Sequence, residues 1–154
     1  MRYAHLLTGF EITNLRKKKA IMLIQEIMTK RVVTIEMDDK LSVVKDIFEN
    51  SKFHHLLVIE DDKLFGVVSD RDLLKALSPN LGTMTETYKD AATLSKKVHQ
   101  IMTRKPITLL ASATVKDAVN LFNNHRISCI PIVDKDFRPV GIVSWRDILR
   151  TMFK

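Results

Sequence analysis

The sequence predicts an α/β (α+β) fold in which two β-α-β-β-α units pack with pseudo-twofold symmetry. One observation is an internal repeat: within the 154 residues, Ile27–Thr29 returns as Ile101–Thr103, and Gly66–Asp72 returns as Gly141–Asp147. The other is that each copy alternates short β-branched runs with segments of helical periodicity. A period this long that occurs twice does not suit a solenoid, because solenoids need three or more stacked units.

The elements of the first copy follow in order from its pattern. Val32–Ile35 is a β-branched run typical of a strand. Residues 41–50 carry apolar side chains at helical spacing, and Asp38, Asp39 and Ser42 offer N-cap groups for that helix. The rest of the copy predicts a strand, a hairpin turn, a second strand and a helix, at residues 56–59, 61–63, 64–68 and 70–77. The second copy repeats the order, with strands at 107–110, 130–133 and 140–143 and helices at 115–122 and 146–153.

This pattern divides the chain into a basic leader (1–23), a first unit (24–78), a linker (79–96) and a second unit (97–154). A unit of about 55 residues buries little surface by itself. The inner strands are apolar throughout, which indicates burial on both faces. We therefore expect the two units to share an interface, with sheet pairing across it.

Charge and cysteine content narrow the class of protein. The net charge is +7, but Arg2 and Arg16–Lys19 supply much of it, so we expect a solvated leader rather than a nucleic-acid site. Met22, just before the first unit, offers an alternative translation start. The single cysteine, Cys129, excludes an intramolecular disulfide and suits a reducing compartment. No apolar run approaches the roughly 20 residues that span a bilayer, so we expect a cytoplasmic protein without membrane contact.

The sequence lacks the common catalytic and metal-binding patterns. It holds no Gly-x-Ser-x-Gly turn, Walker-type loop, Gly-x-Gly-x-x-Gly loop or His-Glu-x-x-His helix. Of its five histidines only His54 and His55 are adjacent, and neighbours on a strand point to opposite faces. We therefore expect neither an enzyme nor a metal site.

The repeated segment Gly-h-h-Ser-x-Arg-Asp, where h is hydrophobic, is the candidate for ligand binding. Ser69–Asp72 and Ser144–Asp147 each stand where a strand ends and a helix begins. The N–H groups at a helix start favour an anion such as phosphate, the arginine adds a charged contact, and the aspartate can accept hydrogen bonds from a diol such as ribose. Alternatively, both segments are helix caps whose aspartates favour the helix dipole. Duplication copies caps as well as sites, so both interpretations stay open.

In order and spacing, these motifs resemble the cystathionine β-synthase (CBS) domain: Ile-Met-Thr, Thr-Val/Ile, an Ala/Val helix, Ile-Pro-Ile-Val-Asp and Gly-Ile-Val-Ser-x-x-Asp. The resemblance covers residues 24–78 and 97–153, and two tandem copies are similar to a Bateman module. It implies clefts that bind an adenosine ligand (AMP, ADP, ATP or S-adenosylmethionine), a stand-alone regulatory role through an unidentified partner protein, and a homodimer. A ligand-free structural or protein-interaction module is the alternative.

The resemblance also implies two sets of contact residues. In each, serine holds phosphate, aspartate holds ribose, apolar strand residues hold adenine, and the first strand of the partner repeat completes the cleft. The first set is Thr29, Thr34, Phe53, His54, Ser128, Cys129, Ile142, Ser144, Arg146 and Asp147. The second set is His54, His55, Val67, Ser69, Arg71, Asp72, Thr103, Thr108, Ile127 and Ser128.

The two copies differ where a ligand would bind. His54 and His55 stand where the second copy has Ser128 and Cys129, so we predict that the cleft bearing Asp72 prefers the more highly charged ligand. Two further departures would narrow a cleft: Leu57 in place of the proline of the other copy, and the bulky Trp145 in place of an aspartate.

Overall fold

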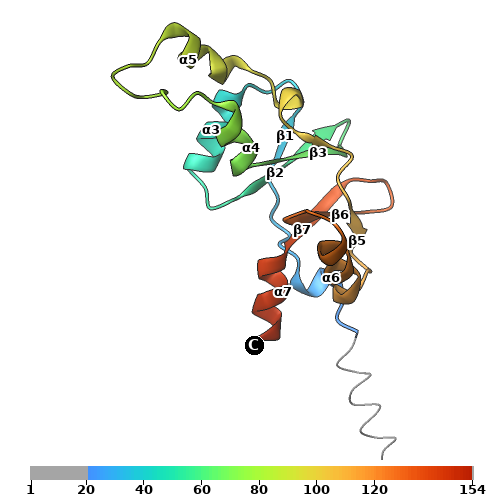
Figure 1. The fold of residues 1–154 in the computed structure, drawn as a ribbon. Helices are drawn as coiled ribbons and strands as arrows, with labels where there is room; N and C mark the ends of the chain where they lie inside the picture. Colours follow the sequence, from blue (N-terminus) through green and yellow to red (C-terminus); the bar gives the residue numbers. More distant parts are fainter. Residues whose placement is uncertain (1–20, 154) are drawn as a thin grey trace, which may run out of the picture.

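Two β-α-β-β-α units lie one above the other (Figure 1). The structure is a computed structural model that describes residues 21–153, so Arg16–Lys19 lies outside the described residues. The first unit comprises β1 (Thr34–Glu36), α3 (Leu41–Glu49), β2 (His55–Glu60), β3 (Lys63–Ser69) and α4 (Asp70–Ala76). The second comprises β5 (Leu109–Leu110), α6 (Val115–Asn124), β6 (Cys129–Val133), β7 (Pro139–Ser144) and α7 (Trp145–Met152). The predicted fold class and element order are confirmed.

The two sheets have matching topology. β1 pairs parallel with β2, and β2 pairs antiparallel with β3. In the second unit β5 pairs parallel with β6, and β6 pairs antiparallel with β7. The predicted turn between β2 and β3 is formed by Asp61 and Asp62, whose φ angles of 49° and 61° lie in the left-handed region. Two successive positive φ angles are typical of the tight hairpin turns that match strand twist.

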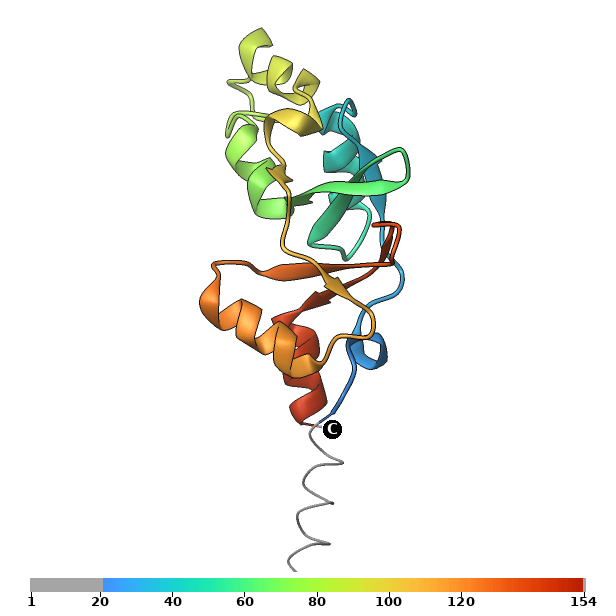
Figure 2. The same cartoon turned by 90° about the vertical axis from the view of Figure 1, so that its right-hand side faces the viewer.

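The segment that joins the units contains α5 (Tyr88–Ala92) and the 3-10 turns η1 (Thr93–Ser95) and η2 (Val98–Gln100). Its α5 end projects away from the first unit (Figure 1). From there the chain passes through β4 (Thr103–Arg104) and runs down to β5 in the second unit (Figure 2).

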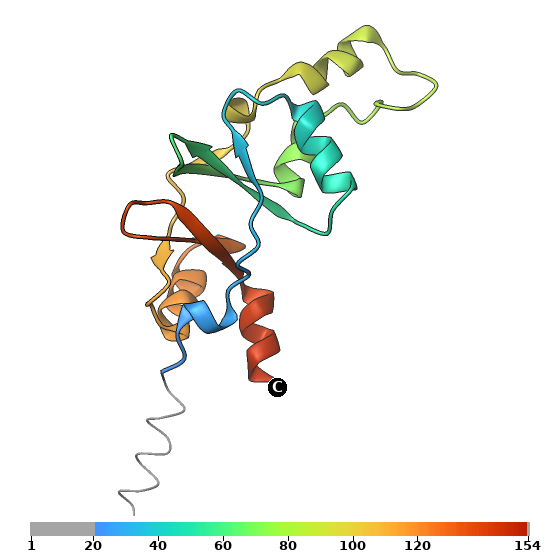
Figure 3. The same cartoon turned by 180° about the vertical axis from the view of Figure 1, so that it is seen from behind.

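Each unit takes its first segment from the other repeat. The short helix α2 (Ile24–Ile27) precedes the first repeat, yet it packs in the second unit, beside α6 and α7 (Figure 3). There the Ile24 N–H donates to the Ala113 carbonyl at 2.8 Å, and in the first unit the Val98 N–H donates to the Asp39 carbonyl at 2.9 Å. The two pairs occupy equivalent positions in the repeats, so these hydrogen bonds obey the pseudo-twofold symmetry.

Sheet pairing crosses between the repeats, as predicted. Thr103 in β4 pairs with Val67 of β3, which makes β4 the fourth strand of the first sheet. At the equivalent place Thr29 and Ile142 exchange two backbone hydrogen bonds, of 2.9 and 3.0 Å. These contacts place the threonine of each Ile-Met-Thr motif against the last strand of the opposite repeat.

The repeated glycines permit this close approach. A Cβ on Gly141 would lie 2.6 Å from the Met28 sulfur and 3.2 Å from the Thr29 carbonyl oxygen. A Cβ on Gly66 would lie 2.9 Å from both the Met102 sulfur and the Thr103 carbonyl oxygen. The Ile-Met-Thr and Gly-h-h-Ser motifs therefore recur together because they pack against each other across the repeats.

The N-cap predicted for the first long helix is wrong. The N-cap residue of α3 is Lys40, whose side chain makes no capping hydrogen bond. The Leu41 N–H instead donates to the Lys96 carbonyl at 2.9 Å, while the Asp39 carboxylate accepts from the Glu36 N–H at 2.8 Å. A tertiary contact thus satisfies the helix start, and the aspartate stabilises the turn before it.

Apolar side chains form three clusters. One fills each unit, and the third lies between the two sheets. The inter-sheet cluster consists of Leu57, Leu64, Val67, Cys129 and Val133. The burial predicted for both faces of the inner strands is confirmed, since all residues of β6 are buried.

Candidate functional site

A groove of about 570 Å³ lies at the junction of the units. Both α4 and α7 begin at this groove, so it joins the two Ser-x-Arg-Asp segments. Its volume falls within the range of small-molecule sites. The lining residues are Thr29, Lys52, Phe53, His54, His55, Ser69, Asp70, Arg71, Ser128, Ile142, Ser144, Trp145, Arg146, Asp147 and Arg150.

Strand-to-helix junctions place the serines and aspartates. Ser69 donates from its N–H and its Oγ to Asp72 Oδ2, at 2.9 and 2.7 Å. Ser144 donates in the same way to Asp147 Oδ2, at 2.8 and 2.7 Å. In both residues Oδ2 takes the capping hydrogen bonds, and Oδ1 has no hydrogen bond to any described residue. The geometry satisfies the capping interpretation and still leaves one carboxylate oxygen able to accept from a ligand.

The two adjacent histidines have different partners, as their predicted opposite directions require. His54 Nδ1 lies 2.8 Å from Asp70 Oδ2 within the first unit. His55 Nε2 lies 2.9 Å from Ser128 Oγ of the second unit. The positions at which the copies differ in sequence therefore meet directly across the junction.

Burial sets the protonation state of His55. Desolvation lowers the pKa of His55 from its ordinary value of 6.5, although the nearby Asp70 carboxylate favours the charged form. The shift favours the neutral imidazole, which offers a single N–H. For Asp70, desolvation raises the pKa, but hydrogen bonds from the His54 ring and the Arg71 N–H outweigh it, and the net shift is downward.

Two residues of the predicted sets lie in the inter-sheet cluster. Val67 and Cys129 are each only 8% exposed. Desolvation, with a smaller effect of the Asp72 carboxylate, raises the pKa of the Cys129 thiol to about 12, so the thiol is inert at neutral pH. Leu57, which was expected to narrow a cleft, is buried in the same cluster, whereas Trp145 does line the groove.

The remaining predicted residues do not line the groove. Thr34 is exposed on β1, Thr103 is exposed on β4, and Ile127 packs against the core of the second unit. Thr108 and Asp72 are half-buried outside the lining. The groove thus unites most of the first set with five residues of the second, namely His54, His55, Ser69, Arg71 and Ser128.

Sequence reasoning missed two cations of the groove, Lys52 and Arg150. Arg150 follows Arg146 by four residues on α7, and that spacing puts both side chains on one helix face. This signal was available in the sequence. Lys52 lies in the loop before β2, where no periodicity indicates which way a side chain points.

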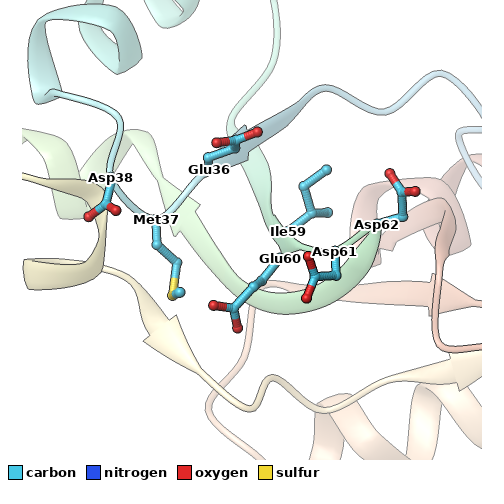
Figure 4. A pocket seen from close by; sticks show the side chains of 7 residues that line it. All are labelled: Glu36, Met37, Asp38, Ile59, Glu60, Asp61 and Asp62. Carbon is cyan, nitrogen blue, oxygen red and sulfur yellow. The ribbon is translucent and has the colours of Figure 1, made fainter.

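A second hollow, of about 350 Å³, lies beside β1 and β2. It is lined by Met37, Ile59 and the acidic residues Glu36, Asp38, Glu60, Asp61 and Asp62. Figure 4 shows that the carboxylates spread over the hollow and do not point to a common centre. Within residues 21–153 no group of three potential ligands is placed to hold a metal ion. None of the helices described in this range combines the length and the apolar character that a membrane span requires.

Comparison with known families identifies the repeat. The CBS domain model matches residues 24–79 and 98–154. The chain belongs to the CBS domain family. It is a CBS pair, and the groove lies between its two CBS units.

Similar proteins cover nearly the same length. A CBS domain-containing protein of Dictyostelium discoideum is 31% identical over 86% of this chain and 92% of its own. The solved CBS domain pair of protein MJ0100, in complex with 5′-methylthioadenosine and S-adenosyl-L-methionine, is 28% identical, with a TM-score of 0.72 over 86% of this chain and 97% of that one. The Arabidopsis thaliana CBS-pair protein CBSX2, solved in complex with AMP, is 27% identical, with a TM-score of 0.71 over 85% and 96%.

Proposed function

We propose that this CBS pair is a regulatory module that binds an adenosine ligand in the groove between its units. The observation that carries the proposal is the meeting of Ser144 and Asp147 with Thr29 and Phe53 of the other repeat in one groove. A hydroxyl at a helix start suits phosphate, a carboxylate suits the ribose diol, and Phe53 and Ile142 offer apolar surface to a base. The adenosine compounds bound by two similar CBS pairs support the ligand class.

The role we propose is regulatory and not catalytic. A bound ligand would join the units, because the groove takes side chains from both repeats. The signal would then pass to a partner protein or change self-association. The preference of the cleft bearing Asp72 for the more highly charged ligand stays a prediction. Titrating Asp72→Ala and Asp147→Ala with AMP and ATP tests it.

We also propose a homodimer through the helices that begin at the groove. Leu74 on α4 is 74% exposed and Met152 on α7 is 71% exposed, and Phe153 follows at 86%. These exposed apolar side chains lie on the two helices that begin at the groove, one in each unit, and a second copy could cover them. Light scattering would report a dimer, and the charged variant Met152→Glu should shift the chain toward the monomer.

The alternative is a module whose groove stays empty. It is favoured by one observation: in both pairs the serine N–H and Oγ donate to the aspartate Oδ2, so each aspartate already has a structural role at a helix start. In that case the geometry shared by the two repeats would serve only the starts of α4 and α7.

Thermal denaturation with adenosine, AMP, ADP, ATP, 5′-methylthioadenosine and S-adenosylmethionine separates the two functions. A ligand that binds only the folded state stabilises it by about 2.7 kcal/mol at 100 times its Kd, which moves the midpoint by several degrees. A midpoint that none of the six compounds changes would refute the proposed function and support the empty module.

A further inference from the structure

Four basic side chains line the groove: Lys52, Arg71, Arg146 and Arg150. They come from both repeats, with Lys52 and Arg71 in the first unit and the other two on α7. Two carboxylates, Asp70 and Asp147, line it as well. Positive side chains therefore flank the groove from both units and outnumber the negative ones.

This positive charge is not neutralised within the described structure. None of the four cations forms an ion pair with a described residue, whereas Asp70 is paired with His54 at 2.8 Å. Asp147 already accepts two hydrogen bonds from Ser144. A concave surface with an excess of one charge focuses the field inside it, so the surplus of basic side chains makes the groove attract anions and oppose cations.

We infer that the groove selects among adenosine ligands by charge, taking nucleoside polyphosphates and rejecting sulfonium compounds, with Lys52 and Arg150 as specificity residues. The inference rests on the proposed function. AMP, ADP and ATP carry increasing negative charge, whereas S-adenosylmethionine carries a sulfonium and an ammonium group against one carboxylate. A net cation therefore meets repulsion where a polyphosphate meets attraction.

Lys52 and Arg150 are assigned to the outer phosphates because they lie outside the Ser-x-Arg-Asp segments. The serine, arginine and aspartate of a segment suffice for ribose and one phosphate. Arg150 extends the basic face of α7 one turn beyond Arg146 and presents a planar fork suited to phosphate oxygens. Lys52 supplies a flexible ammonium from the opposite repeat, so a chain of phosphates would be held from both units.

Isothermal titration calorimetry in metal-free buffer tests this inference. The ligands are adenosine, AMP, ADP, ATP and S-adenosylmethionine, and the variants are Lys52→Gln and Arg150→Gln. The control is Lys116→Gln, which removes an equal charge from the exposed face of α6, away from the groove. All three side chains are exposed, so circular dichroism should give wild-type melting for each variant.

We expect affinity to rise from adenosine through AMP and ADP to ATP, with S-adenosylmethionine weaker than adenosine. Each groove variant should weaken ATP binding roughly tenfold, as expected for loss of one charge-assisted contact, and leave adenosine within about twofold. Lys116→Gln should leave both unchanged, and added salt should weaken ATP more than adenosine.

The possible failures are distinguishable. S-adenosylmethionine binding as tightly as ATP would overturn the inference and leave the proposed function intact. The same conclusion follows if the two groove variants bind ATP as the Lys116→Gln control does. If neither adenosine nor any of its derivatives binds, the proposed function falls, and the inference falls with it.

Discussion

Asp147 should matter for ligand binding beyond its role as a helix cap, and the chain contains a matched control. Thr114 donates from its N–H and its Oγ to Asp117 Oδ2 at 2.9 and 2.7 Å, the same arrangement as in the pair of Ser144 and Asp147. Asp117 caps α6 and does not line the groove. Comparing Asp147→Ala with Asp117→Ala therefore separates capping from ligand contact.

The expected magnitudes follow from these contacts. Each substitution removes one capping box, which costs about 1 kcal/mol of unfolding free energy without ligand. With AMP at 100 times its Kd, wild type and Asp117→Ala should each gain about 2.7 kcal/mol. Loss of the hydrogen bonds from ribose to Asp147 costs about 2 kcal/mol, roughly a 30-fold rise in Kd. At the same AMP concentration the gain of Asp147→Ala should then fall to about 0.9 kcal/mol.

Urea denaturation followed by circular dichroism, with and without AMP, measures both quantities. The ligand-free midpoints show whether the two caps are of similar strength. The increments caused by AMP then report ligand contact alone. Equal increments in Asp147→Ala and Asp117→Ala would refute our assignment and leave Asp147 as a cap.

Three further predictions concern the junction of the units. Gly141→Ala should lower the unfolding free energy by about 1–3 kcal/mol, because its Cβ would overlap the Met28 sulfur, and adding Met28→Ala should recover part of the loss in urea titrations. The folded pKa of His55 is lowered by burial, so the unfolded chain binds the proton first, and stability should fall as pH drops from about 6.5 through the folded pKa. His55→Gln should flatten that fall, measured as urea midpoints between pH 7.5 and 5, and an unchanged slope would contradict the assignment. Cys129, with its pKa raised to about 12, should react slowly with a thiol reagent at pH 8 in the folded protein and rapidly in urea; fast reaction in the folded state would contradict its burial.

Local patterns predicted the elements well where neighbouring residues decide the structure. The α6 periodicity, the turn at Asp61 and Asp62, and the helix start after Ser69 all depend on side chains within a few positions of one another. The start of α3 could not be predicted in this way, because its first N–H bonds to the Lys96 carbonyl, more than fifty residues away. Contacts between residues far apart in the sequence also explain the position of α2. This helix adjoins the first repeat in the sequence, yet it packs in the core of the second unit.

The residues of the candidate site likewise fall into those that local pattern could predict and those that it could not. The repeated serine, arginine and aspartate were identifiable because duplication preserved their spacing. Val67 and Cys129 could be placed on strands, but not assigned to the inter-sheet cluster, since either face of a strand buried on both sides looks alike in sequence. Lys52 could not be found because a loop residue has no periodicity to orient it.

The two copies, most of their helices and strands, the helix starts at Ser69 and Ser144 and the resemblance to the CBS family could all be recognised in the sequence, because each depends on short-range pattern and its recurrence. The meeting of Ser69 and Ser144 in one groove, and the 2.9 Å contact of His55 with Ser128, became visible only in the folded chain. The tertiary structure also decided that the groove keeps an excess of positive charge. The physical reason is that packing of the two sheets, and the exchange of first segments between repeats, bring together side chains that no local pattern relates.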